Sequence, residues 1–122
     1  DDPLVPYDGG CIDVPLTPEC SRGEVLSTLE SIEKFRDFNL CPNPSETEAI
    51  VDNIPNDDTS VEITRYEDCT AGTEVVLVKI VGGGHTWPGG AQYLSSNMIG
   101  LVSHEINASE LILDFFLSHS RN

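Results

Sequence analysis

Apolar residues recur at helical steps in two segments of the chain. The first segment carries them at Val25, Leu26, Leu29, Ile32 and Phe35. Steps of three and four residues predict an amphipathic helix over about 22–38. Ser21 and Glu24 have the spacing of a capping box at its start, and Asn39 with the following Cys41-Pro42 marks its end.

The second helical pattern closes the chain. Asn107-Ala108-Ser109-Glu110 has the form of a helix cap. The apolar face that follows is formed by Ala108, Leu111, Ile112, Phe115 and Phe116. We therefore expect a C-terminal helix that packs through this face against other elements.

Between the two helices the pattern changes to that of strands. Apolar residues alternate over about 60–67 and run almost continuously over 74–81, with a turn at 68–73 between them. This pattern predicts an antiparallel hairpin. Residues 1–20, 42–59 and 91–106 are rich in polar and turn-forming residues and are expected to be irregular.

These elements predict one α/β unit over residues 1–122. The run Val75–Val81 has a single polar residue, Lys79, so both faces of this strand should be covered. Two helices and a hairpin provide little cover, and an isolated unit of this kind would expose a strand edge and an apolar face. We therefore expect self-association or association with a further part of the same protein.

The charge of the chain narrows the classes of partner. With 21 acidic and 6 basic residues the net charge is −15. Nucleic acids and anionic membrane surfaces are bound through clustered Lys and Arg, so neither is expected as a partner. No apolar run has the roughly 18 residues of a membrane-spanning helix.

Four cysteines, Cys11, Cys20, Cys41 and Cys69, allow two disulfides in three connectivities. Pairing of Cys11 with Cys20 would close a proline-containing loop, and pairing of Cys41 with Cys69 would join a helix end to a strand end. The alternative is four reduced thiols. A zinc site is not expected because no Cys-x-x-Cys occurs. Disulfides would indicate an oxidising compartment, that is, a secreted protein.

A glycine-rich loop with a histidine follows the strand at 74–81. Its sequence is Gly82-Gly83-Gly84-His85-Thr86-Trp87-Pro88-Gly89-Gly90. Such a loop can hold an imidazole at a fixed position beyond a strand end. The simpler interpretation is a turn whose histidine only makes a local hydrogen bond.

The first residues, Asp1-Asp2-Pro3-Leu4-Val5-Pro6-Tyr7, favour a catalytic role for this histidine. An acidic residue before Pro-x-Val-Pro resembles the loop that carries the triad acid in α/β-hydrolases. Together with the histidine loop and the closing helix, it resembles the esterase family of polyhydroxybutyrate depolymerases and feruloyl or acetylxylan esterases. The resemblance implies a C-terminal fragment of an α/β-hydrolase fold: helix, β-hairpin, histidine loop and C-terminal helix.

The resemblance assigns roles to individual residues. It implies that His85 is the base of a Ser-His-Asp triad and Asp2 the acid. Trp87, and on weaker grounds Tyr7, would line the cleft for a carboxylic ester substrate. The chain has no Gly-x-Ser-x-Gly nucleophile motif, which precedes the acid in this fold. The serine is therefore expected outside these residues, and the chain alone should be inactive.

No cofactor or metal is implied. His104, Glu105 and His119 lack ligand spacing, and Asp52, Asp57 and Asp58 do not fit a calcium loop, so all six are expected to be solvated. The rival hypothesis is a stand-alone acidic, disulfide-linked binding domain, in which Trp87 would contact the partner.

Overall fold

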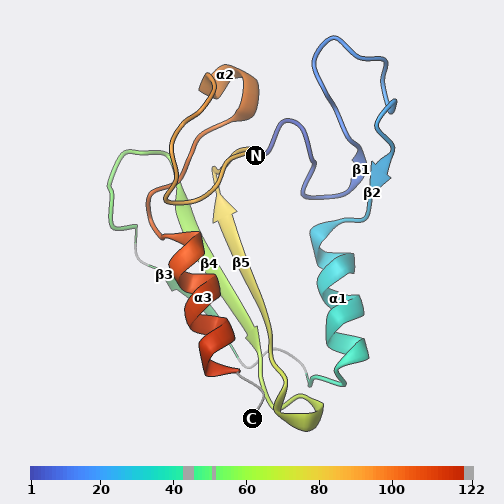
Figure 1. Cartoon of the computed structure of the whole chain (residues 1–122), viewed down its shortest axis with the longest axis vertical. Helices are drawn as coiled ribbons and strands as arrows, with labels where there is room; N and C mark the ends of the chain where they lie inside the picture. The colour runs from blue at the N-terminus through green and yellow to red at the C-terminus, as the bar shows by residue number, and fades with distance from the viewer. Residues whose placement is uncertain (43–45, 51, 120–122) are drawn as a thin grey trace.

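The computed structural model describes residues 1–42, 46–50 and 52–119. A three-stranded antiparallel sheet occupies the middle of the molecule, in the order β3 (Glu46–Ile50), β4 (Ser60–Tyr66), β5 (Val75–Val81). Helix α1 (Thr28–Phe38) and helix α3 (Ala108–Ser118) run beside this sheet (Figure 1). Within the described residues, β5 is an edge strand whose second side pairs with no other strand.

The predicted hairpin is confirmed. β4 and β5 pair antiparallel in the register Ser60↔Val81 to Tyr66↔Val75. Because the register is in phase with the apolar alternation, Ile63 and Val78 are directly opposite each other in the ladder. A short 3-10 turn over Thr70–Gly72 joins the strands, in place of a tight two-residue loop.

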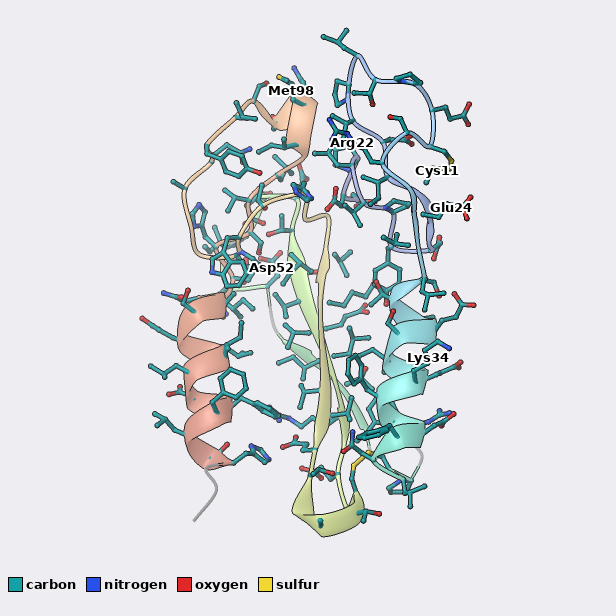
Figure 2. The ribbon with its side chains drawn as sticks, turned by 45° about the vertical axis from the view of Figure 1, so that its right-hand side comes forward. Cys11, Arg22, Glu24, Lys34, Asp52 and Met98 are labelled. Carbon is teal, nitrogen blue, oxygen red and sulfur yellow. A yellow bond between two sulfur atoms is a disulfide. The ribbon has the colours of Figure 1, made fainter. Side chains whose placement is uncertain are left out.

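One predicted helix boundary was wrong. Helix α1 begins at Thr28 rather than near 22, because the capping box is formed by Ser27 and Glu30. Gly23 has φ +88°, and the next two residues form a short strand, β2 (Glu24–Val25), paired with β1 (Gly10–Cys11). Figure 2 shows Cys11 and Glu24 on these paired strands. Extended pairing therefore removes the proposed first turn of the helix.

The second correction concerns the polar stretch 42–59, which was expected to be irregular. Its residues Glu46–Ile50 form β3 and pair with β4 over five positions. Residues 43–45 and 51 of this expected connection lie outside the described residues. A short helix, α2 (Ser96–Ile99), also interrupts the stretch 91–106. The helix predicted at the C-terminus is confirmed, with Asn107 accepting hydrogen bonds from the amides of Ser109 and Glu110.

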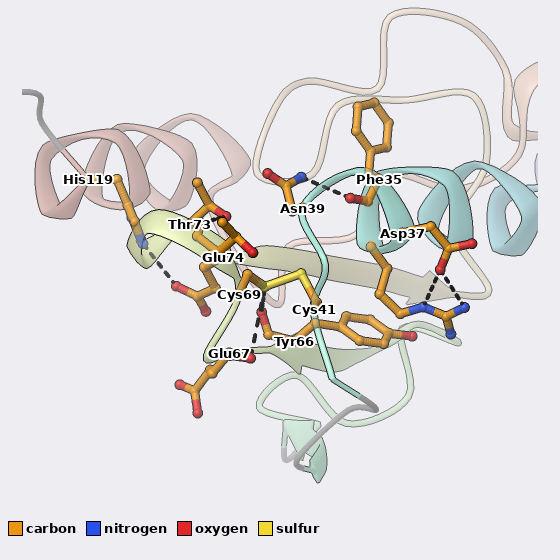
Figure 3. Close-up of a disulfide and its surroundings, with 12 residues drawn as sticks. Phe35, Asp37, Asn39, Cys41, Tyr66, Glu67, Cys69, Thr73, Glu74 and His119 are labelled. Carbon is orange, nitrogen blue, oxygen red and sulfur yellow. Dashed lines mark hydrogen bonds and ion pairs between the residues drawn. A yellow bond between two sulfur atoms is a disulfide. The ribbon is translucent and has the colours of Figure 1, made fainter.

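Both favoured disulfides are present, Cys11–Cys20 and Cys41–Cys69, and none of the four cysteines is free. The second joins the end of α1 to the turn between β4 and β5 (Figure 3). A hydrogen bond from the Thr70 amide to the Asn39 carbonyl supports the same junction. Helix α1 is thereby fixed to the hairpin at one end, although none of its residues is fully buried.

The buried core is small. Its apolar members are Val61, Ile63, Cys69, Val75 and Ile99. On the opposite face of the sheet, Lys79 of β5 pairs with Glu62 of β4 at 3.1 Å. No helix in the described part of the chain is long and apolar enough to cross a membrane.

Candidate functional site

The histidine loop leaves β5 at the end where the chain begins. Figure 1 shows the N-terminus beside the arrowhead of β5. From there the loop runs against the segment around α2 and is bonded to it by main-chain groups. The Gly84 amide donates to the Leu101 carbonyl at 2.9 Å, and the His85 amide donates to the Ile99 carbonyl at 2.6 Å. His85 is therefore held by a second segment of chain as well as by its own turn.

Gly84 makes this close approach possible. A Cβ atom at this position would lie 2.2 Å from the Ile99 carbonyl oxygen and 2.4 Å from the Gly100 Cα. Both neighbours are main-chain atoms, so no side-chain rotation could relieve the overlap. The glycine before the histidine is required by the packing of two backbones, which is one of the uses of glycine at functional loops.

Asp2 reaches this loop from the start of the chain. Its Oδ1 accepts hydrogen bonds from the amides of Leu4 and Val5, at 2.8 and 3.0 Å. Its Oδ2 lies 2.9 Å from Nδ1 of His85, a residue 83 positions away in sequence. The turn formed with Leu4 and Val5 therefore fixes the carboxylate while its second oxygen meets the imidazole.

These contacts favour the charged form of Asp2. Its partial burial by itself would raise the pKa of Asp2. Hydrogen bonds from the Val5 and Leu4 amides and from His85, and the electrostatic attraction of His85, act in the opposite direction. The net effect lowers the pKa of Asp2 below its ordinary value of 3.8. Asp2 is thus a carboxylate at neutral pH. An ionised carboxylate only accepts hydrogen bonds, so Nδ1 of a neutral His85 carries the proton.

That tautomer leaves the lone pair on Nε2. The His85 side chain is 45% exposed, whereas that of Asp2 is 24% exposed. No described residue forms a hydrogen bond with Nε2. An imidazole held at Nδ1 by a carboxylate, with Nε2 free of hydrogen bonds to the described residues, has the arrangement of a general base.

Trp87 lies apart from this pair. Its Nε1 donates to the Ser109 hydroxyl at 3.0 Å. Its side chain lines a groove of about 1210 Å³ between α1, the sheet and α3, to which neither Asp2 nor His85 belongs. The structure therefore brings Trp87 together with the first turn of α3.

Tyr7 likewise has contacts with the scaffold. Its carbonyl accepts from the Thr28 amide at the start of α1, and the Lys79 ammonium lies 5.6 Å from the centre of its ring. These contacts join the N-terminal segment to α1 and β5. Neither Trp87 nor Tyr7, the two aromatic residues predicted to line the substrate cleft, forms a hydrogen bond with Asp2 or His85.

One expectation about acidic residues was wrong. Glu105 is buried, with 8% of its surface exposed, and accepts from the amides of Asn53 and Ile54 at 2.7 and 3.1 Å. Its carboxylate lies within 4.8 Å of those of Asp52 and Asp57. Asp57 accepts from the amide and hydroxyl of Thr59. Three main-chain amides and the Thr59 hydroxyl thus hold Glu105 and Asp57 in this cluster.

His119 is also partnered. Its Nε2 lies 3.2 Å from Glu74 (Figure 3), which in turn pairs with Arg65 at 2.9 Å. This contact joins the end of α3 to the start of β5. His104, by contrast, is exposed, as expected.

Two residues that follow the histidine loop, Gln92 and Tyr93, were not predicted from the sequence. The Tyr93 hydroxyl donates to the His85 carbonyl at 2.8 Å. The side-chain amide of Gln92 bonds to three main-chain groups of the segment that follows the histidine loop, those of Leu94, Gly100 and Val102. No pattern in the sequence signals them, because their partners are main-chain atoms of residues with no common motif.

Comparison with known proteins finds a relative of the chain but no matching family model. No protein-family model matches the chain, and no solved structure matches it significantly. The chain is 30% identical over 119 residues to the protein named "Putative esterase NocK" from Nocardia uniformis subsp. tsuyamanensis. The match covers 95% of this chain but 34% of that protein, so the chain spans about a third of the relative's length. The match supports a relationship to an esterase-like protein, but not to a particular esterase family.

Proposed function

We propose that this chain is the C-terminal part of a serine esterase of the α/β-hydrolase fold, with Asp2 as the triad acid and His85 as the base. The observation that carries the proposal is the 2.9 Å contact between Asp2 Oδ2 and His85 Nδ1. It joins two loops that are far apart in sequence and leaves Nε2 without a hydrogen-bond partner among the described residues. The similarity to an esterase-like protein points to the same chemistry.

In the proposed reaction, Nε2 of His85 takes the proton of a serine hydroxyl while the serine oxygen attacks the ester carbonyl. The imidazolium that forms is stabilised by the Asp2 carboxylate. His85 then gives the proton to the leaving alcohol as the acyl-enzyme forms. Water, activated by the same Nε2, releases the acid. This sequence of steps needs no cofactor.

The serine is proposed to lie in a part of the protein outside these 122 residues. The exposed surface supports this view. A folded monomer of 13.3 kDa is expected to expose about 6,450 Å², whereas this chain exposes 8317 Å². The excess of about 1,900 Å² is larger than one side of a standard protein interface.

The groove marks where such a partner would pack. It is lined by apolar residues of α1, of both strands of the hairpin and of α3, among them Ile32, Phe35, Ile63, Val78, Leu111 and Phe115. Several further apolar side chains on the two helices are more than half exposed, Phe38 and Phe116 among them. We propose that the rest of the esterase covers this groove and supplies the nucleophile. In its absence, the isolated chain is expected to self-associate through the same surface.

A secreted location is part of the proposal. Two disulfides are typical of proteins that fold in oxidising compartments. An extracellular esterase acting on polymeric or cell-wall esters fits this setting and the strong negative charge. The polyhydroxybutyrate depolymerase and feruloyl esterase group remains the proposed family.

A serine-directed fluorophosphonate probe tests the proposal. In the protein encoded by the complete reading frame, we expect labelling of one serine within a Gly-x-Ser-x-Gly motif. His85→Ala should abolish labelling, because an unactivated serine reacts poorly. The matched control is His104→Ala, which removes an exposed histidine with no role in the proposal.

Two results would contradict the proposal. One is a complete reading frame without a reactive serine, which would instead favour the stand-alone binding domain. The other is equal labelling of the wild-type protein and the His85→Ala variant. The 122-residue chain alone should not be labelled.

A further inference from the structure

His85 is held through its main chain on both sides. Its amide donates to the Ile99 carbonyl at 2.6 Å. Its carbonyl accepts from the Tyr93 hydroxyl at 2.8 Å. With both main-chain groups bonded, the peptide planes on either side of His85 cannot rotate freely, so the direction of its Cα–Cβ bond is fixed.

Tyr93 is not placed by burial. It is 59% exposed, so packing of the ring contributes little. What fixes it is the preceding residue. Gln92 donates through Nε2 to the carbonyls of Leu94 and Gly100, at 2.8 and 3.1 Å, and accepts through Oε1 from the Val102 amide at 2.9 Å. One side chain thereby closes the loop from 92 to 102 and sets the starting point of Tyr93.

We propose that Tyr93 is a positioning residue for His85, with Gln92 as the clamp that holds Tyr93 in place. The inference rests on the proposed function, since it concerns the orientation of the proposed base. Tyr93 forms no hydrogen bond with the imidazole or with Asp2. It acts through the His85 carbonyl and limits how often the imidazole moves away from the Asp2 carboxylate.

Tyr93→Phe tests this role, because it keeps the ring and removes only the hydroxyl. Tyr66→Phe is the matched control, since Tyr66 lies at the far end of β4, beside the Cys41–Cys69 disulfide (Figure 3). The probe is the His85 Nδ1 proton, observed by NMR in the chain labelled with ¹⁵N-histidine. Asp2→Asn identifies its resonance, because that variant removes the charged acceptor.

We expect Tyr93→Phe to raise the solvent exchange rate of the Nδ1 proton about two- to twelvefold relative to wild type, which is the range for loss of one neutral hydrogen bond. Tyr66→Phe should leave the rate unchanged. Exchange in Tyr93→Phe no faster than in Tyr66→Phe would overturn the inference. Thermal unfolding of both variants shows whether a change in exchange rate comes from a loss of stability of the whole chain. If Tyr93→Phe accelerates exchange only in proportion to such a loss, the positioning role is also refuted.

A second measurement covers the case in which the isolated chain does not give resolved spectra. In the complete protein, Tyr93→Phe should lower kcat about two- to twelvefold with KM unchanged, because a misdirected base slows the chemical step. An unchanged kcat would overturn the inference. The two proposals fail separately: an absence of ester hydrolysis in the complete wild-type protein defeats the proposed function, whereas the NMR result depends only on the Asp2–His85 contact.

Discussion

Replacing Gly84 by alanine tests how the histidine loop is held. The added Cβ would lie 2.2 Å from the Ile99 carbonyl oxygen and 2.4 Å from the Gly100 Cα, both below the 3.0 Å that real Cβ contacts respect. The two backbones must therefore move apart. That movement would break the Gly84–Leu101 and His85–Ile99 main-chain hydrogen bonds.

The cost follows from these losses. Two main-chain hydrogen bonds contribute roughly 1 kcal/mol each, and overpacking adds about 1–3 kcal/mol where the backbone cannot relax fully. Because separation of the backbones relieves part of the overlap, we expect the free energy of unfolding to fall by about 2–4 kcal/mol. The Asp2–His85 contact should be lost in the same variant, since His85 moves with Gly84.

Urea unfolding followed by circular dichroism measures the first effect, and the His85 Nδ1 proton resonance reports the second. Gly72→Ala is the control: Gly72, unlike Gly84, has a positive φ, +69°, but no atom lies within 4 Å of a Cβ added there. It should cost only about 1 kcal/mol of backbone strain. A Gly84→Ala variant as stable as Gly72→Ala, with the Nδ1 resonance retained, would refute the close packing of the two segments.

Three further outcomes are expected. Removing Cys41–Cys69 by paired alanine substitution should lower the free energy of unfolding by about 3.6 kcal/mol, and removing Cys11–Cys20 should lower it by about 2.6 kcal/mol. Both values follow from the loop-entropy model with sequence separations of 28 and 9. Equal losses in denaturant titrations would contradict this ranking. The stability gained from the lowered pKa of Asp2 is present above its unfolded value of 3.8 and is lost as pH falls through the folded value. The gap in unfolding free energy between wild type and Asp2→Asn should therefore narrow below pH 3.8, and a gap independent of pH would refute the role of the Asp2 charge. Light scattering at micromolar concentration should show that the isolated chain self-associates, whereas a stable monomer would contradict the exposed groove as an interface.

The sequence predicted the elements whose pattern is local. The hairpin was predictable because the apolar alternation of β4 and β5 is in phase with their register. The cap of α3 was predictable because Asn107 bonds to amides two and three residues ahead. In both cases the interacting residues are close in sequence.

Where the prediction failed, distant partners decide the structure. Ser21 and Ser27 are each followed by a glutamate at the capping-box distance, and pairing of β2 with β1 selects the second. β3 consists of Glu-Thr-Glu-Ala-Ile, which has no strong strand pattern and forms a strand by pairing with β4. Glu105 is buried because amides more than fifty residues away need an acceptor.

The candidate site divides in the same way. His85 and Asp2 were proposed from motifs at the end of a strand and at the start of the chain, and the resemblance to esterases linked them. Tyr93 and Gln92 bind main-chain atoms, which any sequence provides, so no motif identifies them. Trp87 follows the histidine by two residues, yet its hydrogen bond to Ser109 directs it to α3.

The central claim is that His85 and Asp2 act together on esters, and the value of kcat/KM in the complete protein tests it most directly. With a short acyl ester as substrate, His85→Gln should lower kcat/KM by about 10⁴–10⁶. Asp2→Asn should lower it by about 10⁴, and His104→Gln should leave it unchanged. Values for His85→Gln and Asp2→Asn within a factor of ten of the wild type would contradict the account, because these residues would then not be part of the catalytic machinery.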